Sequence, residues 1–462
     1  MSKRNLIWLA ILALLVAAVY RLTPMAARQD AVYRTYAPLV EVDSLIRQKF
    51  VEPVPGDRLV EGAIRGMMLK LDPYSGYIAP EELDAFRRIA SGKYTGIGVM
   101  LGVRGGRLTV IAPIEQSPAV QAGVRADDVI QAIDGRSTEG LSVADVDRLL
   151  TGAPGSTVRL TVLHPSSDLT ETVAIARAPI SVHTVKGMRH DGAGDWDYLI
   201  EHDPDVAYIR VAAFHDNTSF EFDRALEGLV SAGAAGLILD LRFNPGGSLP
   251  AAVAVVDRFI SEGTIVSTVT RDQANDRYKA RAEDTIGPIP LAVLINGNSA
   301  SAAEIVAGAL QDHRRAVIVG TRSFGKGVVQ SVVPLHGQRA AVSLTVAHYC
   351  LPNGRVIHKT PQNAHSGEWG VVPDLVVEIT PSETDAITSR RNELDQVPSS
   401  PTTAPTTQNA QPGTATPPLE ILMDRQLFAA LQAVRARIEV PLRSDAAHTL
   451  GPEDRTGDEA DD

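Results

Sequence analysis

Residues 291–330 have the sequence LAVLINGNSASAAEIVAGALQDHRRAVIVGTRSFGKGVVQ, and their pattern predicts the fold class of the surrounding region. The apolar run 291–295 predicts a buried strand. Asn298 or Ser299 can cap the Ala-rich helix that follows, and the apolar run 316–319 predicts the next strand. The order strand, helix, strand is typical of a parallel sheet in an α/β domain.

A serine and a lysine fall at the same edge of this predicted sheet. Ser301 lies in the first turn of the helix, just beyond the carboxyl end of a strand, where open α/β sheets bind their ligands. Lys326 follows the next strand, 25 residues further along the chain, and lies between two glycines. Helix N-termini also offer free N–H groups to anions. We therefore expect a hydroxyl group and an amine to meet at this edge.

Nucleotide binding is one chemistry that this stretch allows. Residues 320–326 match most of a phosphate-binding loop, GxxxxGK, and a predicted strand precedes them. The motif also requires Ser or Thr after the lysine, and then a helix. Gly327 occupies the hydroxyl position here, and the run 328–333 predicts a strand. The stretch therefore fits a phosphate loop only with two departures from the motif.

Two serine chemistries also fit this stretch. A nucleophile elbow has the pattern G-x-S-x-G, which Gly297 and Ser299 begin, but Ser301 stands where the last glycine belongs. A Ser–Lys pair with a neutral lysine as general base would instead use Ser301 and Lys326. The residue types alone leave all three chemistries open, because a serine at a helix start is commonly a cap.

The runs 299–304 (SASAAE) and 324–327 (FGKG), followed by Gln330, resemble the carboxy-terminal processing, or tail-specific, serine proteases. This resemblance covers roughly residues 35–380. It implies a serine-type endopeptidase in which Ser301 is the nucleophile, Lys326 is the general base and Gln330 orients the lysine. It implies neither a cofactor nor a metal ion.

A second part of the same resemblance concerns stabilisation of an oxyanion. A predicted buried strand ends with Asp240 and Arg242 and leads into Phe-Asn-Pro-Gly-Gly, similar to the D-L-R-x-N-P-G-G run of the family. Two glycines after a strand can point backbone N–H groups at a developing negative charge. We expect Gly246 or Gly247 to serve in this way together with the N–H group of Ala302, while Asp240 and Arg242 are expected to be structural.

Residues 91–178 are similar to a PDZ domain. The similarity is carried by a glycine loop, a helix that ends at a glycine, an Asp-Gly turn and a second helix, in that order. The loop consists of Gly96, Ile97, Gly98 and Val99, and its N–H groups would bind the carboxylate of a peptide C-terminus. In one departure, Thr151 stands where several relatives carry an arginine that couples peptide occupancy to activation.

Residues 1–22 predict a signal peptide or a membrane anchor. Two basic residues precede the uncharged apolar run 6–20, which has the length of a signal-peptide core. Either form places the rest of the chain outside the cytoplasm, in the periplasm or secreted. If it is not cleaved, the run 6–20 would anchor the protein to the inner membrane.

The chain is therefore expected to be a multidomain protein of the α+β and α/β classes, with a Ser–Lys site at strand ends of an α/β core. The predicted parts are N-terminal helices over 30–90, the PDZ domain over 91–178, the protease core over 180–380, a disordered Pro/Thr/Ser linker over 397–418, a helix over 419–440 and an acidic tail over 444–462. Asp424 is expected to cap the last helix, whose apolar face must be buried on the body or on a partner chain.

Composition narrows the function further. A net charge of −11 without a basic run argues against nucleic acid as a partner. The single cysteine excludes an internal disulfide, and the 11 histidines include no H-E-x-x-H. Expected partners are protein or peptide substrates bound by their C-termini, a second copy of the chain or an adaptor protein. The alternative function is a catalytically inactive PDZ adaptor or scaffold. The presence of all three residues, Ser, Lys and Gln, argues against it.

Overall fold

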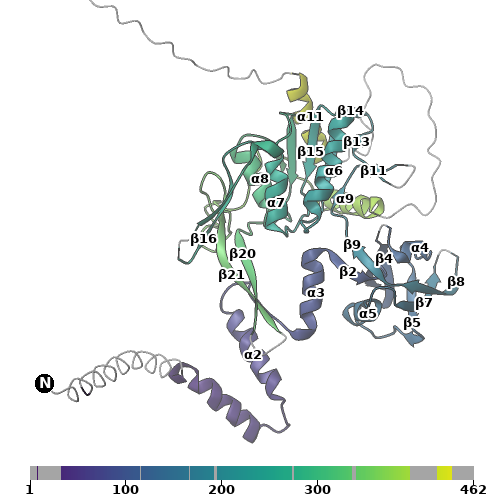
Figure 1. The fold of residues 1–462 in the computed structure, drawn as a ribbon, viewed down its shortest axis with the longest axis vertical. Coiled ribbons are helices and arrows are strands. Elements are labelled where there is room, and N and C mark those ends of the chain that lie inside the picture. Colours follow the sequence, from purple (N-terminus) through teal and green to yellow (C-terminus); the bar gives the residue numbers. More distant parts are fainter. Residues whose placement is uncertain are drawn as a thin grey trace, which may run out of the picture. The chain divides into compact units, whose positions relative to one another are not determined.

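The computed structural model describes residues 33–114, 116–165, 167–191, 195–272, 275–335, 340–395 and 424–439, together with residue 8 (Figure 1). The segments predicted as a signal or anchor (1–22), a linker (397–418) and an acidic tail (444–462) lie outside these residues, apart from residue 8. The chain divides into two units, one of residues 1–79 with 332–344 and one of residues 80–331 with 345–462.

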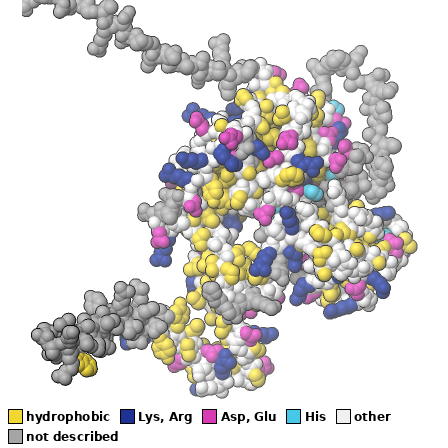
Figure 2. All heavy atoms as spheres, in the orientation of Figure 1, with side chains coloured by type: hydrophobic (Ala, Val, Ile, Leu, Met, Phe, Trp, Pro, Cys, Tyr) yellow, Lys and Arg dark blue, Asp and Glu magenta, His cyan; other side chains and the backbone are white. Residues whose placement is uncertain are grey.

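The first unit begins with helices. Residues 33–49 are helical, and α2 spans Gly56–Met68. Several apolar side chains in this region are largely exposed, with Leu39 50%, Val42 52% and Phe50 57% accessible. Figure 2 shows hydrophobic side chains among the charged ones on this part of the surface.

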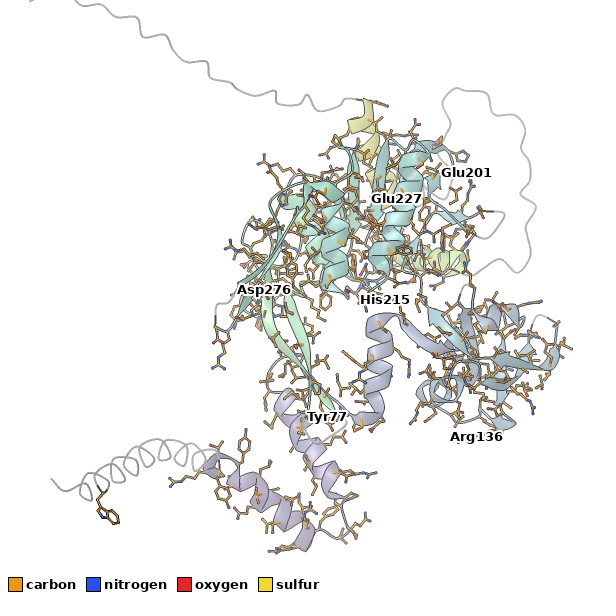
Figure 3. All side chains as sticks on the ribbon, in the orientation of Figure 1. Tyr77, Arg136, Glu201, His215, Glu227 and Asp276 are labelled. Carbon is orange, nitrogen blue, oxygen red and sulfur yellow. The ribbon has the colours of Figure 1, made fainter. Side chains whose placement is uncertain are left out.

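A short turn connects α2 to strand β1 (Gly76–Ile78). Asp72 closes this turn by accepting two backbone N–H groups, each at 2.7 Å. The guanidinium group of Arg65 lies 5.2 Å from the ring centre of Tyr77, which is labelled in Figure 3, and so ties helix to strand. β1 pairs antiparallel with the first residues of β21 (Ala341–Cys350).

In the second unit, helix α3 (Pro80–Ser91) leads into a six-stranded sheet with the order β3-β4-β5-β7-β8 and β6 beside β5. Its elements are β3 (Val99–Arg104), β4 (Arg107–Pro113), α4 (Pro118–Gln121), β5 (Val129–Ile133), β6 (Arg136–Ser137), α5 (Val143–Leu150), β7 (Thr157–His164) and β8 (Leu169–Ala176). Alternate strand residues such as Val158, Leu160 and Val162 fill the core of this sheet. Beside it, β2 (Lys93–Gly96) pairs with β9 (Ala178–Ser181).

A seven-stranded sheet follows, with the order β10-β14-β15-β18-β19-β22 and β13 beside β14. Its strands are β10 (Val185–Lys186), β13 (Leu199–Ile200), β14 (Asp203–Val211), β15 (Gly236–Asp240), β18 (Leu291–Ile295), β19 (Val317–Gly320) and β22 (Leu375–Val376). The pairings from β14 to β22 are parallel, whereas β10 and β13 pair antiparallel with β14. The parallel arrangement predicted from residues 291–319 is present within a sheet that is mixed as a whole.

Helices cover both faces of this sheet. On one face lie α6 (Thr218–Ser231), α7 (Leu249–Asp257) and α8 (Ala302–Asp312), and on the other lies α11 (Arg425–Glu439) (Figure 1). Neighbouring residues of β15 point to opposite faces. Leu239 therefore joins the core beneath α6, α7 and α8, whereas Ile238 packs with residues of α11.

The other described elements are short strands, a turn and one helix. They are β11 (Arg189–His190), β12 (Trp196–Asp197), β16 (Thr264–Thr270), β17 (Asn275–Lys279), the 3-10 turn η1 (Ala282–Asp284), β20 (Val328–Pro334) and α9 (Pro381–Leu394). β20 pairs with β21, and β16 pairs antiparallel with β17 and with the last residues of β21.

Candidate active site

Ser301 occupies a sharp turn between β18 and α8. It is the N-cap of α8 and has φ +55° and ψ −114°, a backbone conformation that a residue with a side chain rarely adopts. Such a residue costs of order 1–3 kcal/mol and persists only where the surrounding structure holds it. A strained turn from strand to helix is also the backbone that exposes a nucleophilic serine in a nucleophile elbow.

The helix therefore begins later than predicted, and the expectation that Asn298 or Ser299 caps it is wrong. The hydroxyl group of Ser299 donates to the carbonyl oxygen of Leu241 at 2.8 Å and accepts the N–H group of Asn296 at 2.9 Å. Ser299 is fully buried, so its hydroxyl serves these two loops rather than the end of a helix. This assigns a structural position to Ser299 and leaves Ser301 at the tip of the turn.

A buried carboxylate, that of Glu304, joins the Ser301 turn to the Lys326 loop. Its Oε2 accepts the N–H groups of Ser301 at 2.9 Å and Lys326 at 2.8 Å. Its Oε1 accepts the N–H group of Gly325 at 2.7 Å and the hydroxyl group of Ser323 at 2.6 Å. Burial raises the pKa of Glu304, while these four donors work in the opposite direction.

The role of Glu304 was not predicted from the sequence, although this residue belongs to the run that carries the family resemblance. Its position three residues after the N-cap is that of the acidic residue in a capping box, and this was the signal available. In a capping box the side chain of this acidic residue accepts the backbone N–H group of the N-cap residue. The bond from the Ser301 N–H group to Glu304 is this interaction. The three bonds that the Lys326 loop donates to Glu304 depend on tertiary structure and have no local signature.

Lys326 lies in the loop between β19 and β20. Gly325 has φ +87°, and a Cβ atom there would lie 2.8 Å from Lys359 and 2.9 Å from Trp369, which explains the glycine before the lysine. The ammonium nitrogen of Lys326 lies 3.0 Å from Oε1 of Gln330, the pair that the resemblance predicted to interact. Burial lowers the pKa of Lys326, and the charge of Glu304 opposes this shift.

The phosphate-loop hypothesis is wrong. The residues after Lys326 form strand β20 (Val328–Pro334), whereas the phosphate loop requires a helix there, whose N-terminus would face the phosphate groups.

Residues 243–247, here called the glycine turn, pack directly against Ser301. Gly246 has φ +96°, and a Cβ atom there would lie 2.7 Å from the Cβ of Ser301 and 2.9 Å from the nitrogen of Ala302. The N–H group of Gly246 donates to Oδ1 of Asn244 at 2.8 Å. Among the residues that the structure describes, the N–H groups of Gly247 and Ala302 have no acceptor.

The structure therefore brings together six of the predicted site residues, namely Ser301, Lys326, Gln330, Gly246, Gly247 and Ala302. The predicted carboxylate loop does not belong to this group. It connects β2, which ends at Gly96, to β3, which begins at Val99. Ile97 is buried. Gly98 has φ +79°, and a Cβ atom there would lie 2.2 Å from that of Ser117. The close approach of the Ser117 side chain at this loop, together with the positive φ, explains its glycine.

Two further observations concern metals and membranes. Within the described ranges, no group of three or more His, Cys, Asp and Glu side chains could hold a metal ion. No helix in the same ranges combines the length and the apolar character that a membrane crossing requires.

The chain matches three family models, namely peptidase family S41 over residues 205–377, the PDZ domain over 109–163 and the activating protease CtpB N-terminal domain over 21–82. It is 38% identical over 352 residues to a carboxy-terminal-processing protease of Bartonella bacilliformis, covering 75% of this chain and 76% of the relative. A carboxyl-terminal-processing protease of Picosynechococcus is 36% identical over 352 residues, covering 74% and 80%. A chloroplastic C-terminal processing peptidase of Tetradesmus obliquus is 34% identical over 363 residues, covering 74% of each chain.

The chain belongs to peptidase family S41 and is a multidomain α+β protein with an N-terminal helical domain, a PDZ domain and a protease core built on a mixed sheet. Within this family it is a carboxyl-terminal-processing serine protease whose PDZ domain binds the C-termini of protein or peptide substrates. The family resemblance and the enzyme class predicted from the sequence are confirmed.

Proposed function

We propose that Ser301 and Lys326 form the catalytic pair of this protease and that Gln330 orients the lysine. The observation that carries the proposal is the strained position of Ser301 at the start of α8, joined through Glu304 to the loop of Lys326. The 3.0 Å contact between Lys326 Nζ and Gln330 Oε1 supports the third role.

The reaction proceeds in two stages. Ser301 Oγ attacks the scissile carbonyl carbon and forms a C–O bond, while neutral Lys326 takes the hydroxyl proton. The C–N bond then breaks, and Lys326 returns this proton to the leaving amine. In the second stage Lys326 deprotonates a water molecule, which hydrolyses the acyl ester and restores the Ser301 hydroxyl group.

Lys326 must be neutral to act as the base. A lysine at its reference pKa of about 10.4 is almost fully charged at pH 7, so the environment of Lys326 must lower its pKa for the amine to accept a proton. Burial of Lys326 acts in this direction. The negative charge of Glu304 raises the pKa of Lys326 and so reduces the fraction of neutral lysine. The same carboxylate holds the backbone of Lys326 in position.

We assign the oxyanion-binding N–H groups to Gly247 and Ala302. Both lack an acceptor within the described part of the chain, whereas the N–H group of Gly246 is engaged by Asn244. Gly246 would instead provide the space in which the glycine turn approaches Ser301. Two preorganised donors at this place would stabilise the charge that develops on the carbonyl oxygen.

Substrate C-termini would bind at the loop of Gly96, Ile97, Gly98 and Val99, with the peptide added as a strand beside it. The protein would act outside the cytoplasm, as a periplasmic or secreted enzyme, with residues 6–20 as a signal core or an inner-membrane anchor. A second copy of the chain or an adaptor protein stays a prediction from the sequence.

The test uses the purified full-length chain and fluorescently labelled β-casein, which is unfolded. We expect hydrolysis by the wild type and by Ser261→Ala, an exposed serine, and none by Ser301→Ala. A chelator should leave hydrolysis unchanged. Equal hydrolysis by Ser301→Ala would refute the assignment of the nucleophile.

The role of the PDZ loop is tested with two peptide substrates that differ only at the C-terminus. A free carboxylate should lower KM relative to an amidated C-terminus, because only the carboxylate can accept the loop N–H groups. Equal KM values would contradict capture of the C-terminus. Changing the substrate avoids changing Gly98, whose conformation and surroundings leave no space for a side chain.

A further inference from the structure

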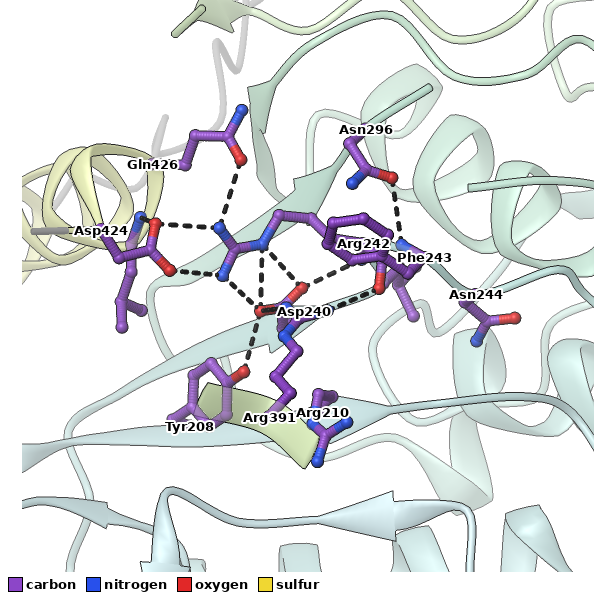
Figure 4. A network of polar contacts seen from close by, with 12 residues as sticks. Tyr208, Arg210, Asp240, Arg242, Phe243, Asn244, Asn296, Arg391, Asp424 and Gln426 are labelled. Atoms are coloured by element: carbon purple, nitrogen blue, oxygen red, sulfur yellow. Dashed lines mark hydrogen bonds and ion pairs between the residues drawn. The ribbon is translucent and has the colours of Figure 1, made fainter. Parts of the chain in front are cut away.

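Four charged side chains from distant parts of the chain form one cluster beside the start of the glycine turn (Figure 4). Asp240 and Arg242 come from the end of β15 and are almost fully buried. Arg391 comes from α9, and Asp424 immediately precedes α11. The charges of the two carboxylates and the two guanidinium groups add up to zero, so the cluster is neutral only when Asp424 is in place.

Asp424 binds Arg242 through both of its oxygens. Arg242 Nη1 donates to Asp424 Oδ1 at 2.9 Å, and Nη2 donates to Oδ2 at 2.8 Å. Nη1 also lies 3.2 Å from Oε1 of the buried Gln426. A bidentate bond fixes the plane of a guanidinium group as well as its position. The segment that begins α11 therefore determines where the Arg242 side chain lies.

The opposite side of Arg242 is held by Asp240 and Arg391. Its Nη2 donates to Asp240 Oδ2 at 2.7 Å, and its backbone N–H group donates to Asp240 Oδ1 at 2.9 Å. Arg391 donates to the same carboxylate at 2.5 Å and to the carbonyl oxygen of Arg242 at 3.0 Å. Both the side chain and the backbone of Arg242 are thus fixed at the residue before the glycine turn.

The glycine turn begins with a strained residue that this cluster supports. Phe243 has φ +64°, which an aromatic residue adopts only under constraint. The guanidinium group of Arg391 lies 5.0 Å from the ring centre of Phe243. The N–H group of Phe243 donates to Oδ1 of Asn296 at 3.0 Å. Without these contacts, the backbone at Phe243 would relax and move the residues after it.

The end of the glycine turn then contacts the nucleophile. The backbone oxygen of Asn244 accepts the N–H group of Ala300 at 2.9 Å, and the Asn244 side chain accepts that of Gly246 at 2.8 Å. Gly246 packs against the Cβ of Ser301. A shift of the turn therefore changes where the Gly247 N–H group lies relative to Ser301.

We propose that Asp424 is a positioning residue for the peptidase reaction: through Arg242 it holds the glycine turn in the geometry that serves the oxyanion. The proposal rests on the function proposed above, because the turn matters for the rate only if Gly247 donates to the oxyanion. It gives α11, joined to the core by the segment 396–423, a part in catalysis without contact to the substrate.

The experiment compares Asp424→Ala with Leu431→Ala in the full-length chain. Leu431 is buried on the same helix but packs in the apolar core away from Arg242, so its replacement destabilises α11 without touching the cluster. With labelled β-casein, we expect Asp424→Ala to lower kcat about tenfold with KM within about twofold, because loss of a whole oxyanion donor costs about 10²–10³ in kcat. Leu431→Ala should lower Tm but keep kcat within about twofold.

Two more variants separate positioning from folding. Asp424→Glu keeps the carboxylate and should recover part of kcat. Arg391→Lys keeps the charge but cannot bind both Asp240 and the Arg242 carbonyl group in the same way, so kcat should fall although the protein folds. These variants decide the question if Asp424→Ala does not fold.

Amide hydrogen exchange of residues 243–248 provides a readout that does not require catalysis. We expect faster exchange there in Asp424→Ala than in Leu431→Ala. Equal kcat for the wild type and all cluster variants, or an equal decrease for Leu431→Ala and Asp424→Ala, would overturn the proposal. If Ser301→Ala instead retained full activity, the function proposed above would fail, and the exchange rates would still show whether Asp424 holds the turn.

Discussion

The backbone N–H groups of Ser301 and Lys326 donate to the same oxygen atom, Oε2 of Glu304, at 2.9 and 2.8 Å. The two residues belong to separate segments, the start of α8 and the loop before β20. Their relative position is therefore set by one buried carboxylate. A catalytic pair requires such an anchor, because a misplacement of about 1 Å can cost about 10²-fold in rate.

Glu304→Gln is expected to reduce kcat/KM about tenfold or more. A hydrogen bond to a charged group contributes about 1.5–3 kcal/mol, and about 1.4 kcal/mol corresponds to a factor of ten. The NH2 group of glutamine only donates hydrogen bonds, so it cannot replace a carboxylate oxygen that accepts them. Hydrolysis of labelled casein measures the effect, with the exposed Glu262→Gln as the matched control. Equal activity of the two variants would show that this carboxylate does not position the pair.

The activity of the wild type should rise with pH along a single limb that reports Lys326. Only the neutral amine accepts a proton, and burial lowers the pKa of Lys326, so the limb should lie below the ordinary lysine value. Lys326→Arg should be as inactive as Lys326→Ala because guanidinium stays protonated, whereas Lys359→Arg should retain activity. A limb near 6.5, with activity in Lys326→Arg, would direct the search to His215, His313 or His348.

Gln330→Ala should weaken the enzyme less than loss of the lysine does. Gln330 contributes one hydrogen bond to Lys326 Nζ, and a typical bond is worth about 0.5–1.5 kcal/mol. We expect a decrease of about 2- to 13-fold in kcat/KM. Steady-state kinetics of Gln330→Ala and Lys326→Ala, measured side by side, compares the two values of kcat/KM. Complete inactivation by Gln330→Ala, with an unchanged circular dichroism spectrum, would assign more than orientation to this amide.

Ser301→Gly should be more stable than Ser301→Ala, although both should be inactive. The backbone at Ser301 has φ +55°. Alanine keeps the strain of this conformation, while glycine adopts it without a steric penalty. The expected gain for glycine is about 1 kcal/mol in the free energy of unfolding, measured by urea denaturation. A less stable glycine variant would mean that the turn is not strained.

The PDZ domain should lose stability as pH rises through the folded-state pKa of His164. The hydrogen bond to Glu171 raises this pKa; burial opposes the increase and Asp128 adds to it. The stabilisation is therefore fully present below the unfolded-state pKa of about 6.5 and lost above the folded-state pKa. Hydrogen exchange of residues 157–164, corrected for intrinsic rates, should show less protection at pH 9 than at pH 6. His164→Gln should remove this pH dependence, and a wild type with equal protection at both values would contradict the linkage.

The features that could be predicted from the sequence are local ones. The apolar run 291–295 is strand β18 at the same residues, and the Ala-rich helix predicted after it is α8, although it begins later than predicted. The apolar face predicted after Asp424 is the one that packs on the sheet. Periodicity and capping depend on neighbours along the chain, so a sequence contains enough information to predict them. The motif around Ser301 and Lys326 identified the family for the same reason, since its residues lie in two short runs.

The groups that hold the site together could not be predicted in this way, because they meet only in the folded chain. The positive φ of Ser301 and the three bonds that the Lys326 loop donates to Glu304 have no signature in the local pattern. The contact between Arg242 and Asp424 joins residues 182 positions apart. A buried charge is stable only beside a specific opposite charge, and which charges meet depends on how the sheet, α9 and α11 pack. That packing is a property of the whole chain, so no single stretch of sequence can encode it.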